Sequence, residues 1–169
     1  MCAVAVIYED VPARDLAMYL SAGLAQKFQP DLAFDFTWWG FKYLSDPNVA
    51  CEAAEAAAAA DLILVAVGQP DDFPPEIRAW FESSLGRRPT AEGALVWVHT
   101  STEASDKIHA QDAFLRSLAQ RANLEYLPLS SASLGDVPAV QPGENLPLPH
   151  EAGPDRAREY PSSRWGINE

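Results

Sequence analysis

The sequence predicts one α/β domain built on a doubly wound, three-layer, five-stranded parallel sheet in the strand order 2-1-3-4-5. Two observations lead to this prediction. Short apolar segments alternate regularly with segments whose apolar residues recur at helical spacing. One apolar segment, residues 61–68, is continuous, as expected of a strand covered on both faces. Such alternation implies parallel strands joined by right-handed crossovers.

The first half of the chain contains two predicted strand–helix pairs. Residues 3–8 are a short β-branched run typical of a strand, and residues 10–28 follow with helical spacing and Asp10 as the expected N-cap. The aromatic, alternating residues 32–44 predict the second strand. The alanine-rich residues 46–60 predict the second helix, since alanine has the highest helix propensity.

The second half continues the alternation and then loses it. Strands are predicted at residues 61–68, 93–101 and 124–130, and helices at residues 74–86 and 105–122. Beyond them no clear fifth helix is found, and seven of the fourteen prolines lie between Pro128 and Pro161. We therefore expect an α/β domain at 1–130 and an irregular tail at 131–169. This tail would replace the fifth helix by packing on the domain or on a partner subunit, anchored by Trp165 and Ile167.

Composition argues against several classes of function. With a net charge of −12 and only twelve lysines and arginines, the chain does not suit nucleic acid or an anionic membrane. Its two cysteines, Cys2 and Cys51, form neither a disulfide framework nor a metal-ligand pattern. No apolar run is long enough for a membrane helix, which needs ~20 residues. We expect a soluble protein of the reducing cytoplasm.

Candidate ligand-binding residues are those at the carboxyl ends of the predicted strands, where open α/β sheets bind ligands. They are Glu9, Asp10, Gln69, Asp71, His99, Thr100 and Ser101. Glu9, Asp10, Asp71 and Asp72 could hold a divalent cation, or could be ordinary loop carboxylates and helix caps. His99 could position a ligand or be a hydrogen-bonded structural residue. No nucleophile–base pair is evident, so no catalytic residue is assigned.

Residues 61–71, "DLILVAVGQPD", resemble the third strand and following loop of response-regulator receiver domains. In that family a phosphoacceptor aspartate ends the strand; the resemblance puts Ala66 at this position. It equates Glu9 and Asp10 with the metal-binding pair, and Thr100 or Ser101 with the switch hydroxyl. The family's conserved lysine falls at Leu127. The resemblance thus implies a pseudo-receiver that lacks both the phosphoacceptor and the lysine.

The same stretch also resembles flavodoxin-like proteins and NAD(P)H-dependent FMN reductases, through Ala60, Asp61, Pro70, Pro75 and Trp80. Those proteins hold the FMN phosphate in a loop rich in serine, threonine and glycine after the first strand. Here that loop is "YEDVPARD", whose carboxylates would repel a phosphate. We therefore expect no cofactor, with FMN as the alternative.

The aromatic second strand suggests an interaction surface, because it is an edge strand in this topology and exposed aromatic edges invite pairing. The proposed surface residues are Trp38, Trp39, Phe41 and Trp165. Packing into the core is the other interpretation of the three on the strand. Together these observations predict a non-catalytic binding or regulatory module of flavodoxin-like fold that forms a homodimer and has a possible protein partner. An FMN reductase-like flavoprotein is the alternative.

Overall fold

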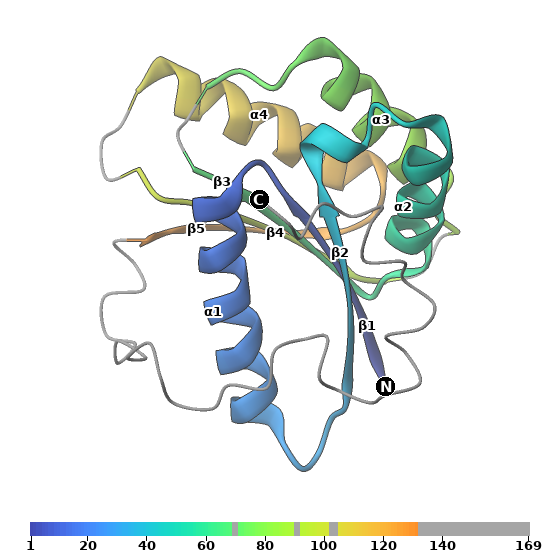
Figure 1. The fold of residues 1–169 in the computed structure, drawn as a ribbon, viewed down its shortest axis with the longest axis vertical. Helices are drawn as coiled ribbons and strands as arrows, with labels where there is room; N and C mark the ends of the chain where they lie inside the picture. The colour runs from blue at the N-terminus through green and yellow to red at the C-terminus, as the bar shows by residue number, and fades with distance from the viewer. Residues whose placement is uncertain (69–70, 90–91, 102–104, 132–169) are drawn as a thin grey trace. The chain divides into compact units, whose positions relative to one another are not determined.

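The structure is a computed structural model that describes residues 1–68, 71–89, 92–101 and 105–131, all within one compact unit, Met1–Pro138. Its five strands form one parallel sheet in the order β2-β1-β3-β4-β5 (Figure 1). This is the flavodoxin-like α/β arrangement, so the predicted fold class is confirmed. The strands are β1 (Cys2–Tyr8), β2 (Phe34–Gly40), β3 (Leu62–Val67), β4 (Ala94–His99) and β5 (Glu125–Ser130).

Four α-helices and one short 3-10 helix connect the strands. They are α1 (Val11–Phe28), η1 (Phe41–Tyr43), α2 (Pro47–Ala59), α3 (Pro75–Leu85) and α4 (Asp106–Arg121). The predicted cap of α1 is confirmed, since an Asp10 carboxylate oxygen accepts a hydrogen bond from the Ala13 amide at 2.9 Å. Ser105 caps α4 in the same way, at 3.3 Å from the Ile108 amide. These local signals explain why the helices begin where the sequence predicts.

The two faces of the sheet are covered differently. Helices α2, α3 and α4 lie on one face and α1 on the other (Figure 1). The core on the α1 side consists of small and medium side chains, namely Val4, Val6, Ala13, Ala17, Leu64, Ala66, Val96 and Val98. The opposite side contains larger ones, including the fully buried Phe81 and Leu115 and the 2% exposed Trp97. We refer to these as the α1 face and the three-helix face.

The second strand ends earlier than predicted. Residues 32–44 were expected to be extended, but β2 stops at Gly40 and Phe41–Tyr43 form η1. Gly40 pairs with Tyr8, the last residue of β1, and a β-carbon at Gly40 would lie 3.0 Å from the Tyr8 ring. The turn that follows places Phe41 against Phe73 and Phe81, with ring centroids 6.0 and 6.3 Å apart. Burial of this aromatic ring thus competes with continuation of the strand.

The predicted tail falls almost wholly outside the described residues. Ser131 is described and donates a hydrogen bond from its hydroxyl to the Thr100 carbonyl at 3.0 Å. The rest of the tail, with Trp165 and Ile167, lies outside. None of the helices in the described ranges is long and apolar enough to cross a membrane.

Candidate functional site

The carboxyl edge of the sheet is bridged by Glu9 at the junction of β1 and β3. These neighbouring strands lead to helices on opposite faces, α1 and α3, which is the arrangement that creates a ligand crevice in open α/β sheets. In this protein a Glu9 carboxylate oxygen accepts a hydrogen bond from the Gly68 amide at 2.8 Å. The Glu9 amide also donates to the Ala66 carbonyl at 3.0 Å. Glu9 therefore ties the ends of the two strands together.

Asp10 fills the adjacent space with a second carboxylate. Besides capping α1, it lies so close to Gly68 that an added β-carbon there would be 3.0 Å from Asp10 Oδ2. Burial raises the pKa of Glu9; the Gly68 amide offsets this in part, and the negative charges of Asp10 and Asp71 raise it further. The junction between β1 and β3 thus carries two carboxylates, and its Gly68 amide is already hydrogen-bonded to one of them.

The Asp71 segment lies beside this junction and is held mainly by α4. Lys107 Nζ is 2.6 Å from Asp71 Oδ1, and its charge and hydrogen bond lower the Asp71 pKa. The Gln111 side-chain amide donates to the Asp71 carbonyl. Phe73 is buried among aromatic rings, 5.7 Å from Phe81 and 5.8 Å from Phe114 between centroids. Because the ion pair is exposed and contributes little, Phe73 and Gln111 are the main anchors of this segment.

His99 and Thr100 form the β4 part of the edge. His99 is 8% exposed, and its ring lies 4.6 Å from the Trp97 ring between centroids. Burial lowers the pKa of His99. The Thr100 hydroxyl donates to the Gly68 carbonyl, and the Ser131 hydroxyl donates to the Thr100 carbonyl. These hydroxyls link the ends of β3, β4 and β5 rather than pointing free into a crevice.

Most predicted site residues are therefore brought to one edge, but in separate roles. Glu9, Asp10 and Thr100 converge on Gly68, whereas Asp71 is bound to α4 and His99 lies on the three-helix face. Gln69 lies outside the described residues, and Ser101 is partly buried with its backbone hydrogen-bonded to the His99 side chain. The described part of the chain contains no group of three or more His, Cys, Asp or Glu side chains that could hold a metal ion.

Two contributors, Lys107 and Gln111, were not anticipated from the sequence. Gln111 is 1% exposed and stands in line with the buried Leu115 and Leu118 on α4. A glutamine at such a position interrupts the apolar side of an amphipathic helix, and this is the signal that could have identified it. Its partner is the Asp71 backbone, forty residues away, and no local pattern indicates such a distant partner.

The two positions important in receivers carry no charged group. Ala66 is fully buried in the core of the α1 face and pairs with Tyr8. Leu127 is 42% exposed, pairs with Val96, and lies inside β5 rather than at its carboxyl end. The Leu127 side chain thus lies in the middle of β5, away from the residues at the carboxyl end of the strand.

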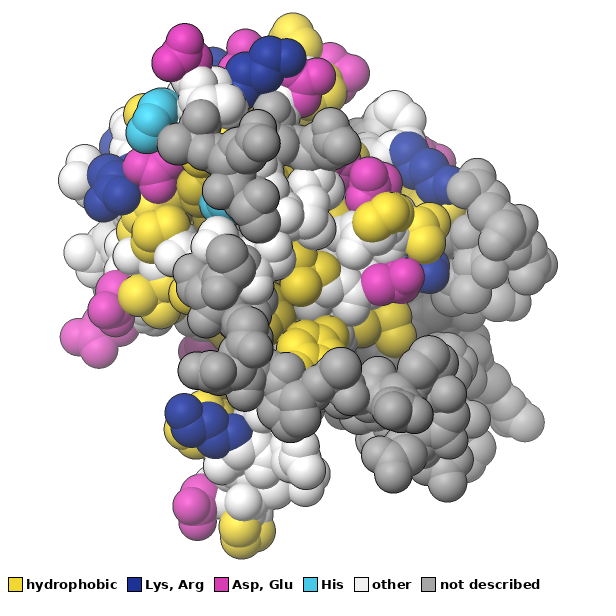
Figure 2. Space-filling model, turned by 90° about the vertical axis from the view of Figure 1, so that its left-hand side faces the viewer, with side chains coloured by type: hydrophobic (Ala, Val, Ile, Leu, Met, Phe, Trp, Pro, Cys, Tyr) yellow, Lys and Arg dark blue, Asp and Glu magenta, His cyan; other side chains and the backbone are white. Residues whose placement is uncertain are grey.

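The aromatic residues proposed as a surface have unequal exposure. Trp39 is 4% and Phe41 is 8% exposed, which favours the core-packing interpretation for these two. Trp38 is only partly buried on the α1 face, where it continues a row of rings through Phe36 and Phe34 at 6.3 and 5.8 Å between centroids. Trp165 lies outside the described residues. Figure 2 shows the side of the protein on which β5 ends, and hydrophobic side chains are exposed at the surface there.

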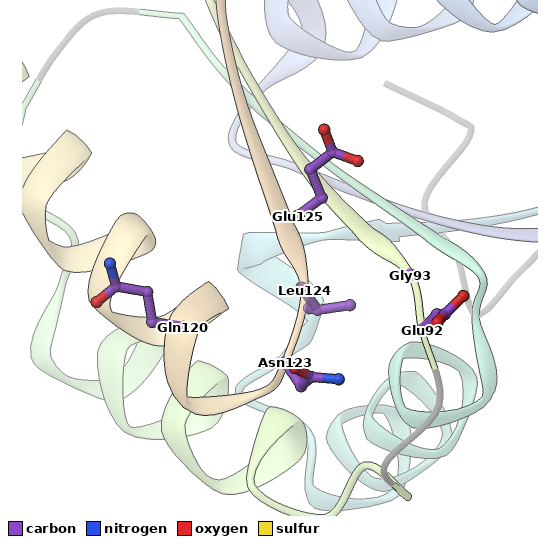
Figure 3. A pocket seen from close by; sticks show the side chains of 6 residues that line it. All are labelled: Glu92, Gly93, Gln120, Asn123, Leu124 and Glu125. Atoms are coloured by element: carbon purple, nitrogen blue, oxygen red, sulfur yellow. The ribbon is translucent and has the colours of Figure 1, made fainter.

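A pocket of about 420 Å³ lies at the opposite, amino edge of the sheet (Figure 3). It is lined by Glu92, Gly93, Gln120, Asn123, Leu124 and Glu125. Glu125 begins β5, and the other lining residues precede β4 or β5 or lie at the end of α4. None of the six was a predicted site residue. Its lining combines two carboxylates with two amides and one apolar side chain, and it is separate from the carboxyl edge described above.

Comparison with known proteins gives no family for the chain: no protein-family model and no curated protein matches it.

Proposed function

We propose that this domain is a non-catalytic binding or regulatory module that presents the carboxyl edge of its sheet to a partner. The main support is that the polar groups of the edge are already engaged with one another. The Glu9 carboxylate is bonded to the Gly68 amide, the Asp10 carboxylate to α1, and the Thr100 hydroxyl to the Gly68 carbonyl. Groups held in this way stabilise the edge as a shaped surface and are poorly placed for proton or phosphoryl transfer.

The resemblance to receiver domains favours one form of this proposal, namely a pseudo-receiver. Phosphoryl transfer would need a carboxylate at Ala66, but this position is a buried methyl group in an apolar cluster. It would also need a cation at Leu127, which is an aliphatic side chain within β5. Incubation with acetyl phosphate and magnesium is therefore expected to leave the intact mass unchanged. An acyl phosphate on Asp71 or Asp72 would contradict the proposal.

The FMN reductase alternative is disfavoured by the N-terminus of α1. Flavodoxin-like proteins use the amides at this position to hold a phosphate. In this chain only Glu9 and Asp10 separate β1 from α1, and the Asp10 carboxylate accepts from the Ala13 amide where a phosphate would bind. Purified protein is expected to be colourless and to leave the fluorescence of micromolar FMN unquenched. Tight one-to-one FMN binding would instead support the reductase.

The aromatic row on β2 supports a homodimer as part of this proposal. Phe34, Phe36 and Trp38 are each only partly buried, and β2 is an edge strand. Pairing of such a surface with a second copy would remove apolar area from water, at about 25 cal/mol per Å². Light scattering on the purified full chain is expected to give the mass of a dimer, and Trp38→Ala to shift it towards the monomer.

A further inference from the structure

His99 occupies a buried position directly behind the carboxyl edge. It is the last residue of β4 and pairs in register with Val67 of β3 and Ser130 of β5. By the alternation of side chains along a strand it shares the three-helix face with Trp97. Its 8% exposure and its ring contact with Trp97 at 4.6 Å show that water has little access to the imidazole.

The imidazole has one nitrogen without a hydrogen-bond partner. His99 Nδ1 is buried and unpaired, as is Nε1 of the neighbouring Trp97. A neutral imidazole tolerates this as an unsatisfied acceptor or donor, at the modest cost of one buried polar group without a partner. An imidazolium would bring a buried N–H group that lacks an acceptor and a charge that lacks a counter-ion, which is far less favourable.

The charged groups around His99 provide little compensation for such a charge. The titratable and charged groups on the neighbouring elements are Asp71 and Asp72 before α3, Glu76, Arg78 and Glu82 on α3, Asp106, Lys107, His109, Asp112, Arg116 and Arg121 on α4, and Glu125 and Tyr126 on β5. A hydrogen bond to the Ser101 backbone and the charge of Asp112 both favour the charged imidazole, but Asp112 already accepts from the Tyr126 hydroxyl at 2.9 Å and pairs with Arg116 at 3.2 Å. Asp71 is paired with Lys107. Desolvation is therefore the largest influence, and it lowers the pKa of His99.

Protonation of His99 would act on the bonds that close the edge. The next residue, Thr100, donates to the Gly68 carbonyl and accepts from the Ser131 hydroxyl. A charged ring that rotates towards water would give up its hydrogen bond to the backbone of Ser101, which helps to hold the chain on either side of Thr100. The ends of β3, β4 and β5 would then lose the contacts that join them.

We propose that His99 is a pH-sensitive switch whose protonation releases Thr100 and opens the carboxyl edge of the sheet. The contribution of neutral, buried His99 to stability is fully present above the ordinary histidine pKa of ~6.5. It is lost as pH falls through and below that value, because the unfolded chain then binds a proton that the folded chain resists. If the edge is the binding surface proposed above, acidification would regulate it. The switch itself requires no ligand.

The test is an NMR titration of the full chain between pH 7.5 and 5.0, combined with hydrogen exchange at the two limits. His109 on α4 is exposed, and His99→Gln and His109→Gln assign the resonances of these two among the three histidines of the chain. We expect His99 to titrate below the ordinary histidine pKa of ~6.5. After correction for the intrinsic pH dependence of exchange, we expect amides at the end of β4 to exchange several-fold faster at pH 5.0. The His109→Gln variant should keep this acceleration, and His99→Gln should lose it.

Two results would overturn the switch. One is a His99 titration at or above the ordinary histidine pKa of ~6.5. The other is exchange at the end of β4 that is the same at both pH values although His99 has taken up a proton. Both measurements use wild-type protein, so they stand even if His99→Gln does not fold. Because neither involves a phosphodonor, flavin or partner, their failure would leave the proposed function untouched.

Discussion

The two faces of the sheet are packed with side chains of different size. On the three-helix face, large rings interlock: Phe81 contacts Phe73 and Trp80 with centroids 5.7 and 5.2 Å apart, and Phe81 is fully buried. On the α1 face, a helix whose buried residues are Ala13, Ala17 and Ser21 packs closely on valines and alanines. Side chains beside that helix, such as Leu129, are only partly buried. Among the described residues, the three helices thus cover their face of the sheet more completely than α1 covers the other.

The comparison predicts unequal costs for the same substitution on the two faces. Phe81→Ala removes a fully buried ring and should lower the free energy of unfolding by about 3–5 kcal/mol. Phe36→Ala removes a partly buried ring on the α1 face and should cost clearly less. Urea denaturation of the two variants measures both effects. Equal losses would mean that the α1 face is as fully covered in solution as the other.

Removal of the predicted tail should affect the domain through the α1 face. The sequence predicts that residues 131–169 take the place of a fifth helix, and burial of one large apolar side chain contributes about 1.5–3 kcal/mol. A chain truncated at residue 131 is therefore expected to melt at a lower temperature or to aggregate. Trp165→Ala in the full chain should reproduce part of the loss. An unchanged melting temperature and oligomeric state would assign the tail another role.

A smaller effect is expected where the faces meet, at the carboxyl edge. Gly68→Ala would place a methyl group 3.0 Å from Asp10 Oδ2 and disturb the cap of α1. Loss of such a cap costs about 0.5–2 kcal/mol. Gly23→Ala is the matched control, since this helical glycine has open space around its β-carbon position and alanine should stabilise α1. In thermal denaturation, Gly68→Ala should melt at a lower temperature than the wild type, and Gly23→Ala at a higher one.

The smallest effect concerns the exposed ion pair of the Asp71 segment. Lys107→Ala breaks the 2.6 Å contact with Asp71, but both side chains are well exposed to water, which screens their attraction. The melting temperature is expected to stay within experimental error. Gln111→Leu is the informative comparison, because it removes the buried bond to the Asp71 carbonyl and should lower the melting temperature measurably. A larger fall in melting temperature for Lys107→Ala than for Gln111→Leu would mean that Lys107 contributes more than Gln111 to holding the Asp71 segment.

Much of the fold was predictable because its signals are local. The α1 cap at Asp10 and the end of α3 at Gly86 depend on residues within one or two turns. The continuous apolar run of β3 follows from burial on both faces, which any doubly wound sheet imposes. The strand order then follows from alternation and crossover handedness. The predicted site residues that the structure describes follow strands that end on the same side of the sheet, because the strands are parallel.

The sequence by itself therefore determined the succession of elements, their caps and the edge at which polar residues gather. Only the tertiary structure decided what those residues do. Glu9 could have faced a ligand, but it accepts from the Gly68 amide, fifty-nine positions along the chain. His99 could have been solvated, but it is buried beside Trp97. Hydrogen-bond partners and desolvation depend on groups far apart in sequence, and only packing brings them within a few ångströms of one another.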